Sequence, residues 1–195
     1  MPEFNVTPSI IRETSSGLFL CSIQDEMLRR REVEYVGEVN AQSVYSICRQ
    51  LRHLQQEDPD GEITLFINSP GGDVISGLAL YDVMKAISCP VRTVCLGMAA
   101  SMGAVLFAAG DKRDILPHGE VMIHDPLIHQ TGGSALALQE TSRRLMGMRE
   151  SLCSILAQHT GKPLEEIYEK TARDTFFSAQ EAVDFGLADR VVDKI

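Results

Sequence analysis

The sequence predicts a single α/β domain built on a mostly parallel sheet, and three observations carry this prediction. Runs typical of strands alternate with runs typical of helices, and the middle of the chain has no short hairpins. At 195 residues, the chain is long enough for one domain with a sizeable core. Hydrophobic residues make up 44% and charged residues 23%, which is an ordinary globular composition.

The first half of the chain alternates helices and strands after an N-terminal arm over residues 1–24. Asn40 is a suitable N-cap for the first helix, whose apolar residues fall on one face. Turn chemistry at Asp58-Pro-Asp-Gly61 and a glycine-rich turn at Ser69-Pro-Gly-Gly72 separate the elements that follow. The expected elements are a helix over 41–57, a strand over 63–67, a helix over 74–87 and a strand over 91–96.

The second half continues this order and contains one long helix. The apolar stripe of that helix has little to pack against locally, so we expect the helix to project and to serve self-association. The stripe consists of Leu145, Met148, Leu152 and Leu156. The run Ser178-Ala-Gln-Glu181 is a capping box, and Gly186 suits the end of the short helix after it. The expected elements are a helix over 102–109, strands around 113–116 and 120–123, a loop over 126–133, the long helix over about 135–159 and a strand over 187–192.

Charge and cysteine content exclude several classes of function. The formal net charge of −9 argues against nucleic acid as a partner, since phosphate binding needs a clustered basic surface. Five cysteines are scattered without metal-binding spacing, which predicts free thiols in a reducing compartment and no metal site. No segment has the length of a membrane span or the pattern of a signal peptide, so we expect a cytoplasmic protein without a membrane partner.

Ser101 is the first candidate for chemistry, because it lies between a strand-type run and an apolar helix-type run. A serine at such a turn stands clear of the sheet and lies at the positive end of the helix dipole. Its small neighbours, in Gly97-Met-Ala-Ala-Ser-Met-Gly103, leave room for a substrate carbonyl. An ordinary helix N-cap is the alternative interpretation of this serine.

A nucleophilic serine needs a base, a group that orients the base, and donors for an oxyanion. Among five histidines, His124 lies at a strand exit, where side chains reach a site. The glycine-rich turn that ends at Gly72 can direct backbone N–H groups at an anion, although a plain tight turn is its commoner use. Asp174 is either a loop cap or a buried partner for an imidazole. Asp125 is the alternative acid, but consecutive strand side chains point to opposite faces, which favours Asp174.

Several motifs occur in a fixed order over about residues 60–192. They are Ser69-Pro-Gly-Gly-Asp-Val74, Gly97-Met-Ala-Ala-Ser-Met-Gly103, Val121-Met-Ile-His124, Arg173-Asp174, Ser178-Ala-Gln-Glu-Ala182 and Phe185-Gly-Leu187. Together they resemble the ClpP family, the proteolytic subunits of Clp proteases. The resemblance implies a crotonase-like α/β fold of superhelical β/α units. Residues 1–24 are then an arm or axial loop, and residues 25–195 are the peptidase domain, with a protruding handle at about 127–159.

The same resemblance implies a serine endopeptidase with a Ser-His-Asp triad. The nucleophile, general base and orienting acid of the family fall on Ser101, His124 and Asp174. Its oxyanion donors fall on the backbone N–H groups of Gly72 and Met102.

The resemblance also implies an assembly and a partner. Subunits of the family form heptameric rings that stack into a tetradecamer through the handle, and their active sites line a closed chamber. A Clp ATPase unfoldase consumes the ATP and threads unfolded proteins into the chamber, so no cofactor is expected in this subunit. Phe66 matches an aromatic position in the docking groove for the ATPase, and Arg173 matches an arginine that contacts the opposite ring.

Some positions depart from the pattern of the family. Ala172 stands where many members carry an aspartate that pairs with the arginine across the rings, and Asp125 stands where glutamine is common. The sequence therefore resembles a divergent paralogue within this family. We expect weak stacking of identical rings until a paralogue or an ATPase supplies the missing contacts.

Two other functions share part of this pattern. A crotonase-fold enzyme acting on a coenzyme A thioester would have the fold and the glycine-rich oxyanion site, but it would not need the triad residues in this register. A regulatory subunit would complete a mixed ring without activity, although all three triad residues are present. Labelling by a fluorophosphonate at Ser101 separates a peptidase from a coenzyme A enzyme.

Overall fold

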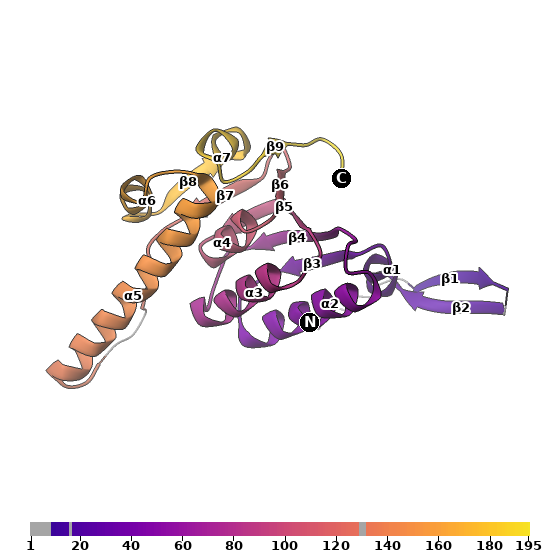
Figure 1. Ribbon diagram of the computed structural model, residues 1–195, viewed down its shortest axis with the longest axis horizontal. Coiled ribbons are helices and arrows are strands. Elements are labelled where there is room, and N and C mark those ends of the chain that lie inside the picture. The colour runs from indigo at the N-terminus through magenta and orange to yellow at the C-terminus, as the bar shows by residue number, and fades with distance from the viewer. Residues whose placement is uncertain (1–8, 16, 129–131) are drawn as a thin grey trace, which may run out of the picture.

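The computed structural model describes residues 9–15, 17–128 and 132–195, with a hairpin at one end and a projecting helix at the other (Figure 1). The hairpin pairs β1 (Ser9–Thr14) with β2 (Gly17–Ser22) in antiparallel register. Helix α1 (Ile23–Arg29) follows directly, and a capping box between Ser22 and Asp25 fixes its start. This helix of seven residues is not among the predicted elements, although Ser22 and Asp25 have the spacing of a capping box. Residues 1–8 of the expected arm lie outside the described residues.

The main sheet is mostly parallel, as the alternating pattern predicts. Five strands lie side by side in the order β3, β4, β5, β6, β9, and each of these pairings is parallel. β7 pairs in parallel with β5 and antiparallel with β8. The bounds are β3 (Glu32–Val36), β4 (Ile63–Ser69), β5 (Val91–Ala100), β6 (Lys112–Ile115), β7 (Glu120–Ile123), β8 (Thr175–Ser178) and β9 (Arg190–Val191). The α/β class is confirmed.

β5 changes its partner along its length, and this change brings two strand ends together. Residues 92–95 pair with β6, whereas residues 98–100 pair with β7. β5 is therefore longer than the strand predicted over 91–96, because the second ladder keeps the chain extended as far as Ala100. Directly after it, the Ser101 backbone N–H donates to the Met122 carbonyl at 2.8 Å. The carboxyl ends of β5 and β7 consequently lie beside each other.

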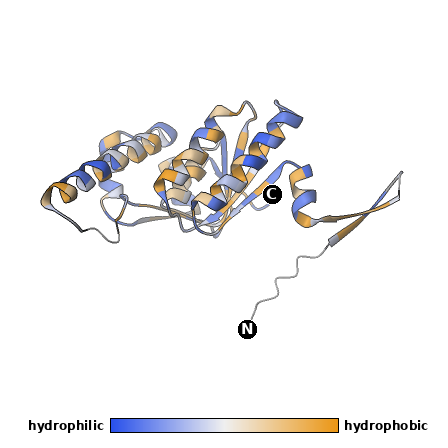
Figure 2. Ribbon diagram, turned by 90° about the horizontal axis from the view of Figure 1, so that it is seen from below, coloured by the Kyte–Doolittle hydropathy of each residue, from blue (hydrophilic) through white to orange (hydrophobic). Residues whose placement is uncertain are grey.

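Three helices lie together on one face of the sheet, and the apolar core lies between helices and strands (Figure 2). They are α2 (Ala41–Glu57), α3 (Val74–Ala86) and α4 (Met102–Ala108). The Asn40 side chain caps α2 as predicted, and the predicted apolar face of α2 is buried. Burying one such side chain contributes about 1.5–3 kcal/mol, so this face holds α2 on the sheet. All seven residues of α4 are buried, which places its N-terminus inside the molecule.

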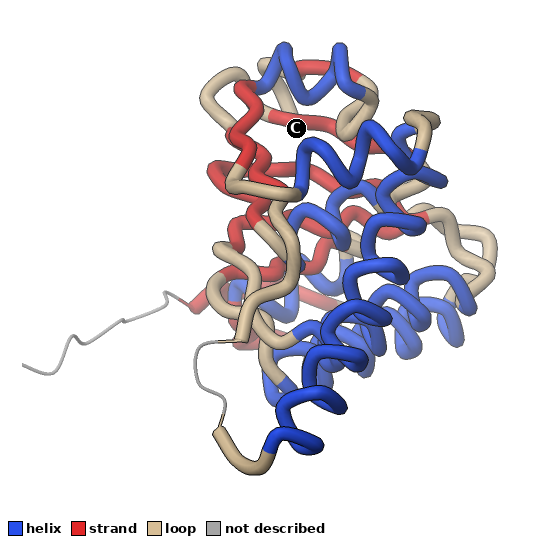
Figure 3. Tube along the Cα trace, turned by 90° about the vertical axis from the view of Figure 1, so that its left-hand side faces the viewer, coloured by secondary structure: helices blue, strands red, loops and turns tan. Residues whose placement is uncertain are grey.

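The long helix α5 (Ala135–Thr160) projects from the rest of the chain (Figures 1 and 3). Its buried residues, Leu152, Cys153 and Leu156, all lie in its C-terminal half. The base is fixed by a 3.2 Å hydrogen bond between Tyr81 Oη and His159 Nε2. The first residues of the predicted stripe are only half-buried, so the expectation of a projecting helix agrees with the packing. None of the helices in the described part of the chain is long and apolar enough to cross a membrane.

The C-terminal region differs most from the prediction. Helix α6 (Leu164–Thr171) is not predicted, and α7 (Ala179–Phe185) begins at the predicted capping box. The strand expected over 187–192 is reduced to β9. The reason is that the backbone N–H groups of Leu187 and Ala188 both donate to the Ala182 carbonyl, which ends α7 and keeps these two residues out of the sheet.

Candidate active site

Ser101 lies at the corner between β5 and α4 in a backbone conformation that a serine rarely adopts. Its φ is 54° and its ψ is −120°. Such a conformation costs a non-glycine residue about 1–3 kcal/mol, and it persists only where the surroundings hold it in place. The side chain makes no capping hydrogen bond to α4. The alternative interpretation of Ser101 as an ordinary N-cap is therefore not supported by its geometry.

The hydroxyl of Ser101 points instead at His124, which directly follows β7. Ser101 Oγ lies 2.8 Å from His124 Nε2, within hydrogen-bond distance. The imidazole is 14% exposed, so it is shielded from water on most sides. Ser101 and His124 meet because β5 and β7 are hydrogen-bonded neighbours whose chains leave the sheet at the same end.

Asp174 lies on the other side of the imidazole, in the segment between α6 and β8. Its Oδ1 atom is 3.2 Å from His124 Nδ1, and its side chain is 62% exposed. The contact has ion-pair distance, but the two groups are not aligned as a hydrogen bond, and His124 Nδ1 has no hydrogen-bond partner among the described residues. The structure thus brings Ser101, His124 and Asp174 together in the order that the sequence predicts.

The glycine-rich turn after β4 packs directly against the Ser101 corner. A Cβ atom on Gly71 would lie 2.6 Å from Ser101 Cβ, and one on Gly72 would lie 2.3 Å from the Val39 carbonyl oxygen. Both glycines also have positive φ, 94° and 146°. Only glycine fits these two positions. The bond from the Val39 N–H to the Gly71 carbonyl, at 2.7 Å, holds the turn on the sheet.

Two backbone donors next to the Ser101 corner have no acceptor among the described residues. Within the described residues, the N–H groups of Gly72 and Met102 make no hydrogen bond. Met102 opens α4, where a backbone N–H has no partner inside the helix. Free N–H groups at the N-terminus of a helix and in a glycine turn attract negative charge. These donors suit an oxyanion that forms on a carbonyl attacked by Ser101.

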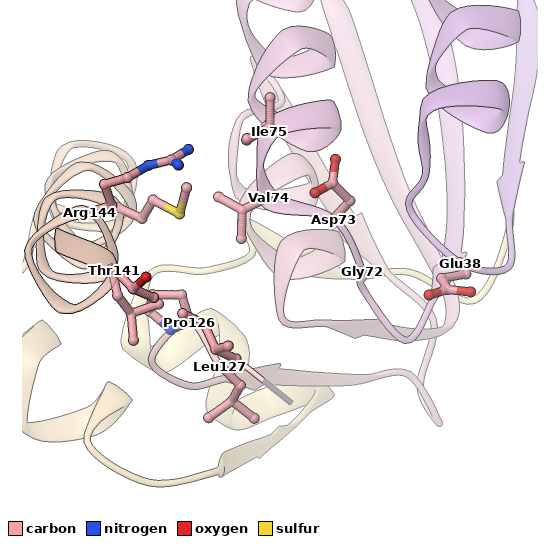
Figure 4. A pocket seen from close by; sticks show the side chains of 12 residues that line it. Glu38, Gly72, Asp73, Val74, Ile75, Pro126, Leu127, Thr141 and Arg144 are labelled. Carbon is pink, nitrogen blue, oxygen red and sulfur yellow. The ribbon is translucent and has the colours of Figure 1, made fainter. Parts of the chain in front are cut away.

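A cleft of about 460 Å³ extends from Gly72 along the projecting helix (Figure 4). Thr141 and Arg144 of α5 lie on one side of it, and Val74 and Ile75 at the start of α3 lie on the other. The remaining walls are formed by Glu38, Asp73, Pro126, Leu127, Ile128, Leu145 and Met148. The lining of the cleft is more apolar than polar, with acidic groups near the glycine turn and one arginine opposite them. This lining suits a peptide with apolar side groups.

A smaller cavity of about 20 Å³ adjoins the side chains of Ser101 and His124. Its lining includes Leu152 and Leu156 from the base of α5, together with Cys153. Burial raises the pKa of the Cys153 thiol, so this thiol stays protonated and is a poor nucleophile. Within the described residues, no group of three or more His, Cys, Asp or Glu side chains could hold a metal ion.

The other two predicted site residues, Phe66 and Arg173, do not line the cavity that adjoins Ser101 and His124. Phe66 is 8% exposed in the middle of β4, and alternation along the strand directs it to the face opposite Leu65 and Ile67, which join the helix-side core. Arg173 is exposed and forms no ion pair with any described residue. Ala172 is the C-cap of α6.

Sequence reasoning missed the role of Gly71 and the partner of Asp125. The sequence shows both glycines of the turn, but only the fold shows that Gly71 contacts Ser101. The Asp125 carboxylate pairs with Arg149 of α5, at 2.7 Å from Nε to Oδ2. Alternation of side chains along the strand was the available signal for the direction of the Asp125 side chain. No local pattern identifies Arg149, 24 residues away, as its partner.

The family model described as Clp protease matches residues 15–195. The matched region includes the Ser101 corner, the glycine turn, the cleft and all three residues of the predicted triad.

Proposed function

The chain belongs to the Clp protease family, and on that premise we propose that it is a serine endopeptidase in which Ser101 attacks the peptide carbonyl. Membership of the family supports a ClpP-type peptidase, a hydrolase with an α/β fold. The observation that carries the assignment of the nucleophile is the 2.8 Å contact between Ser101 Oγ and His124 Nε2. The strained backbone at Ser101 supports it, because strained residues cluster at active sites.

In the proposed mechanism, His124 acts first as a base and then as an acid. Its Nε2 atom takes the hydroxyl proton as Ser101 Oγ bonds to the carbonyl carbon, and it then gives that proton to the leaving amine. Asp174 faces Nδ1, where a carboxylate favours the tautomer with the proton on that nitrogen and stabilises the imidazolium. Water then attacks the acyl-enzyme while His124 takes its proton. His124 returns a proton to Ser101 Oγ as the ester bond breaks, which releases the carboxylic acid product and restores the serine.

The negatively charged oxygen of the tetrahedral intermediate accepts hydrogen bonds from the backbone N–H groups of Gly72 and Met102. Losing a single oxyanion donor typically costs about 2.7–4 kcal/mol of transition-state stabilisation. The cleft beside Gly72 accepts the substrate as an extended peptide, with apolar side groups against α3 and α5.

We further propose that the chain works inside a ring assembly fed by an ATPase unfoldase. The exposed N-terminal half of α5 is available for contacts between stacked heptameric rings, and Arg173 is exposed in the segment that carries Asp174. Phe66 is assigned to the docking groove for the ATPase. The five free cysteines suit a reducing, cytoplasmic location.

A labelling experiment tests the proposed function. Wild-type protein should react with a fluorophosphonate at Ser101 and hydrolyse short fluorogenic peptides, and Ser101→Ala should lose both activities while it remains folded. Ser178→Ala is the matched control, because it removes a serine from a helix N-cap that does not contact His124. If wild-type protein did not label, the peptidase assignment would be wrong. The remaining hypotheses would then be an enzyme that acts on a coenzyme A thioester and a subunit that only completes a mixed ring.

A further inference from the structure

An ion pair between Asp125 and Arg149 joins the strand exit that carries His124 to helix α5. Arg149 Nε donates to Asp125 Oδ2 at 2.7 Å, and the two side chains are mostly buried, with 22% of the arginine and 30% of the aspartate exposed. The guanidinium carbon also lies 4.2 Å from the centre of the Tyr168 ring on α6. A planar guanidinium that both pairs and stacks is held in one orientation.

The backbone of Asp125 holds the segment that leads to Asp174. The Asp125 N–H donates to the carbonyl of Thr171 at 2.7 Å, and Thr171 is the last residue of α6. Arg149 Nη2 reaches the Tyr168 carbonyl of the same helix at 3.4 Å. Asp125 therefore binds α5 through its side chain and the end of α6 through its main chain.

Asp174 itself has little to fix its position. Its side chain is 62% exposed, and within the described residues its carboxylate contacts no hydrogen-bond or ion-pair partner besides His124. The distance between the imidazole and the carboxylate must then be set by the backbones that carry them. Those two backbones meet at the bond from Asp125 to Thr171.

We propose that Asp125 and Arg149 are positioning residues for the triad, a role that rests on the proposed function. The ion pair fixes Asp125, the residue after His124, against α5. The hydrogen bond from the Asp125 N–H to the Thr171 carbonyl then fixes the segment that carries Asp174 relative to His124. A displacement of α5 would therefore change the separation of His124 and Asp174, and with it the rate of proton transfer. Neither Asp125 nor Arg149 touches the substrate carbonyl or the proton in flight.

The test is the effect of Asp125→Asn on kcat and KM for a short fluorogenic peptide. The substitution keeps the shape of the side chain but removes the charge that holds Arg149. We expect kcat to fall about 10- to 100-fold with KM within about twofold of wild type, because displacement of catalytic groups by about 1 Å acts on the chemical step. Arg149→Lys keeps the charge but loses the planar guanidinium, with its several N–H donors and its stacking on the Tyr168 ring. Its kcat should therefore lie between wild type and Asp125→Asn.

A double variant separates positioning from simple loss of stability. Asp125→Asn leaves Arg149 partly buried without a carboxylate partner, which lowers the melting temperature, and adding Arg149→Met removes that unpaired charge. We expect the double variant to regain thermal stability but not kcat. Asp114→Asn is the matched control: Asp114 is buried and pairs with Arg92, near the start of β5, so its loss should lower stability while kcat of the folded protein is unchanged.

Sedimentation velocity on each variant ensures that rates are compared for the same assembly. Normal kcat in Asp125→Asn, or recovery of kcat together with melting temperature in the double variant, would overturn the positioning role. Wild-type protein that neither labels nor hydrolyses peptide would instead refute the proposed function, so the two failures are distinguishable.

Discussion

Replacing Gly71 with alanine should displace Ser101 and slow catalysis in a protein that still folds. The new Cβ atom would lie 2.6 Å from Ser101 Cβ, 2.7 Å from the Ala100 carbonyl oxygen and 3.0 Å from the Met102 nitrogen. Carbon atoms in contact normally stay about 3.5 Å apart, so the two Cβ atoms must separate by about 0.9 Å. A misplacement of about 1 Å at a catalytic group can lower the rate about 100-fold, and we expect kcat to fall to this extent.

Gly37→Ala is a matched control for backbone strain. Gly37 has a φ of 95°, and Gly71 has a φ of 94°, but a Cβ atom on Gly37 would meet nothing within 4 Å. Both variants should lose about 1–2 kcal/mol of folding free energy from left-handed backbone strain. Gly71→Ala should lose about 1–3 kcal/mol more from overpacking. Only Gly71→Ala should change kcat.

Two measurements check this prediction. Denaturant unfolding gives the free-energy loss of each variant, and hydrolysis of a short fluorogenic peptide gives kcat at a temperature where both variants are folded. Wild-type kcat in Gly71→Ala would show that the corner absorbs the new methyl group without moving Ser101. An equal loss of kcat in Gly37→Ala would show that backbone strain, and not the contact with Ser101, controls the rate.

Four further outcomes are expected. Asp174→Asn should lower kcat by up to about 10⁴-fold, as loss of the orienting acid does in another triad, and near-normal rates would place the acid elsewhere. Phe66→Ala should weaken ATPase-dependent degradation of a folded protein but leave hydrolysis of short peptides intact; an equal loss of both activities would contradict its docking role. Ala172→Asp should shift single rings to double rings in sedimentation velocity and raise peptidase activity, unless the wild type is already wholly a double ring. The hydrogen bond from Arg29, together with the charges of nearby arginines, lowers the pKa of Glu26 from the usual 4.5 to about 2. The ionised carboxylate therefore stabilises the fold fully above about pH 4.5, and this stabilisation is lost as the pH falls through about 2. Glu26→Gln should therefore be less stable than wild type at pH 7 in urea unfolding and equal to it near pH 2, and a difference that persists at pH 2 would exclude this cause.

Local sequence patterns predict the elements whose physics is local. The apolar face of α2 and its cap at Asn40 can be found from spacing alone, and the structure agrees with both. The closing strand was predicted too long: it begins at Arg190 and not at residue 187, because the backbone N–H groups of Leu187 and Ala188 are taken by the end of α7. Its sequence fits a strand, and only the neighbouring helix terminus decides otherwise.

The site was predictable to the extent that motifs mark strand ends. Ser101 and His124 each follow a strand, and the pairing of β5 with β7 brings them together. The pairing itself has no sequence signal, because β5 uses two partners in turn. The contact of Gly71 with Ser101 and the pairing of Asp125 with Arg149 depend on tertiary placement, so residue patterns could not reveal them.

The strained backbone of Ser101 also bears on how this chain could change over generations. At a φ of 54°, glycine would relieve the strain, so Ser101→Gly would make the fold more stable. In a lineage that kept the subunit only as a passive member of a mixed ring, that substitution would be accepted by drift or favoured outright. In the proposed function, the use of the Ser101 hydroxyl as the nucleophile offsets the stability that serine gives up at this position. On that proposal, Ser101 distinguishes an active subunit from a passive member of a mixed ring.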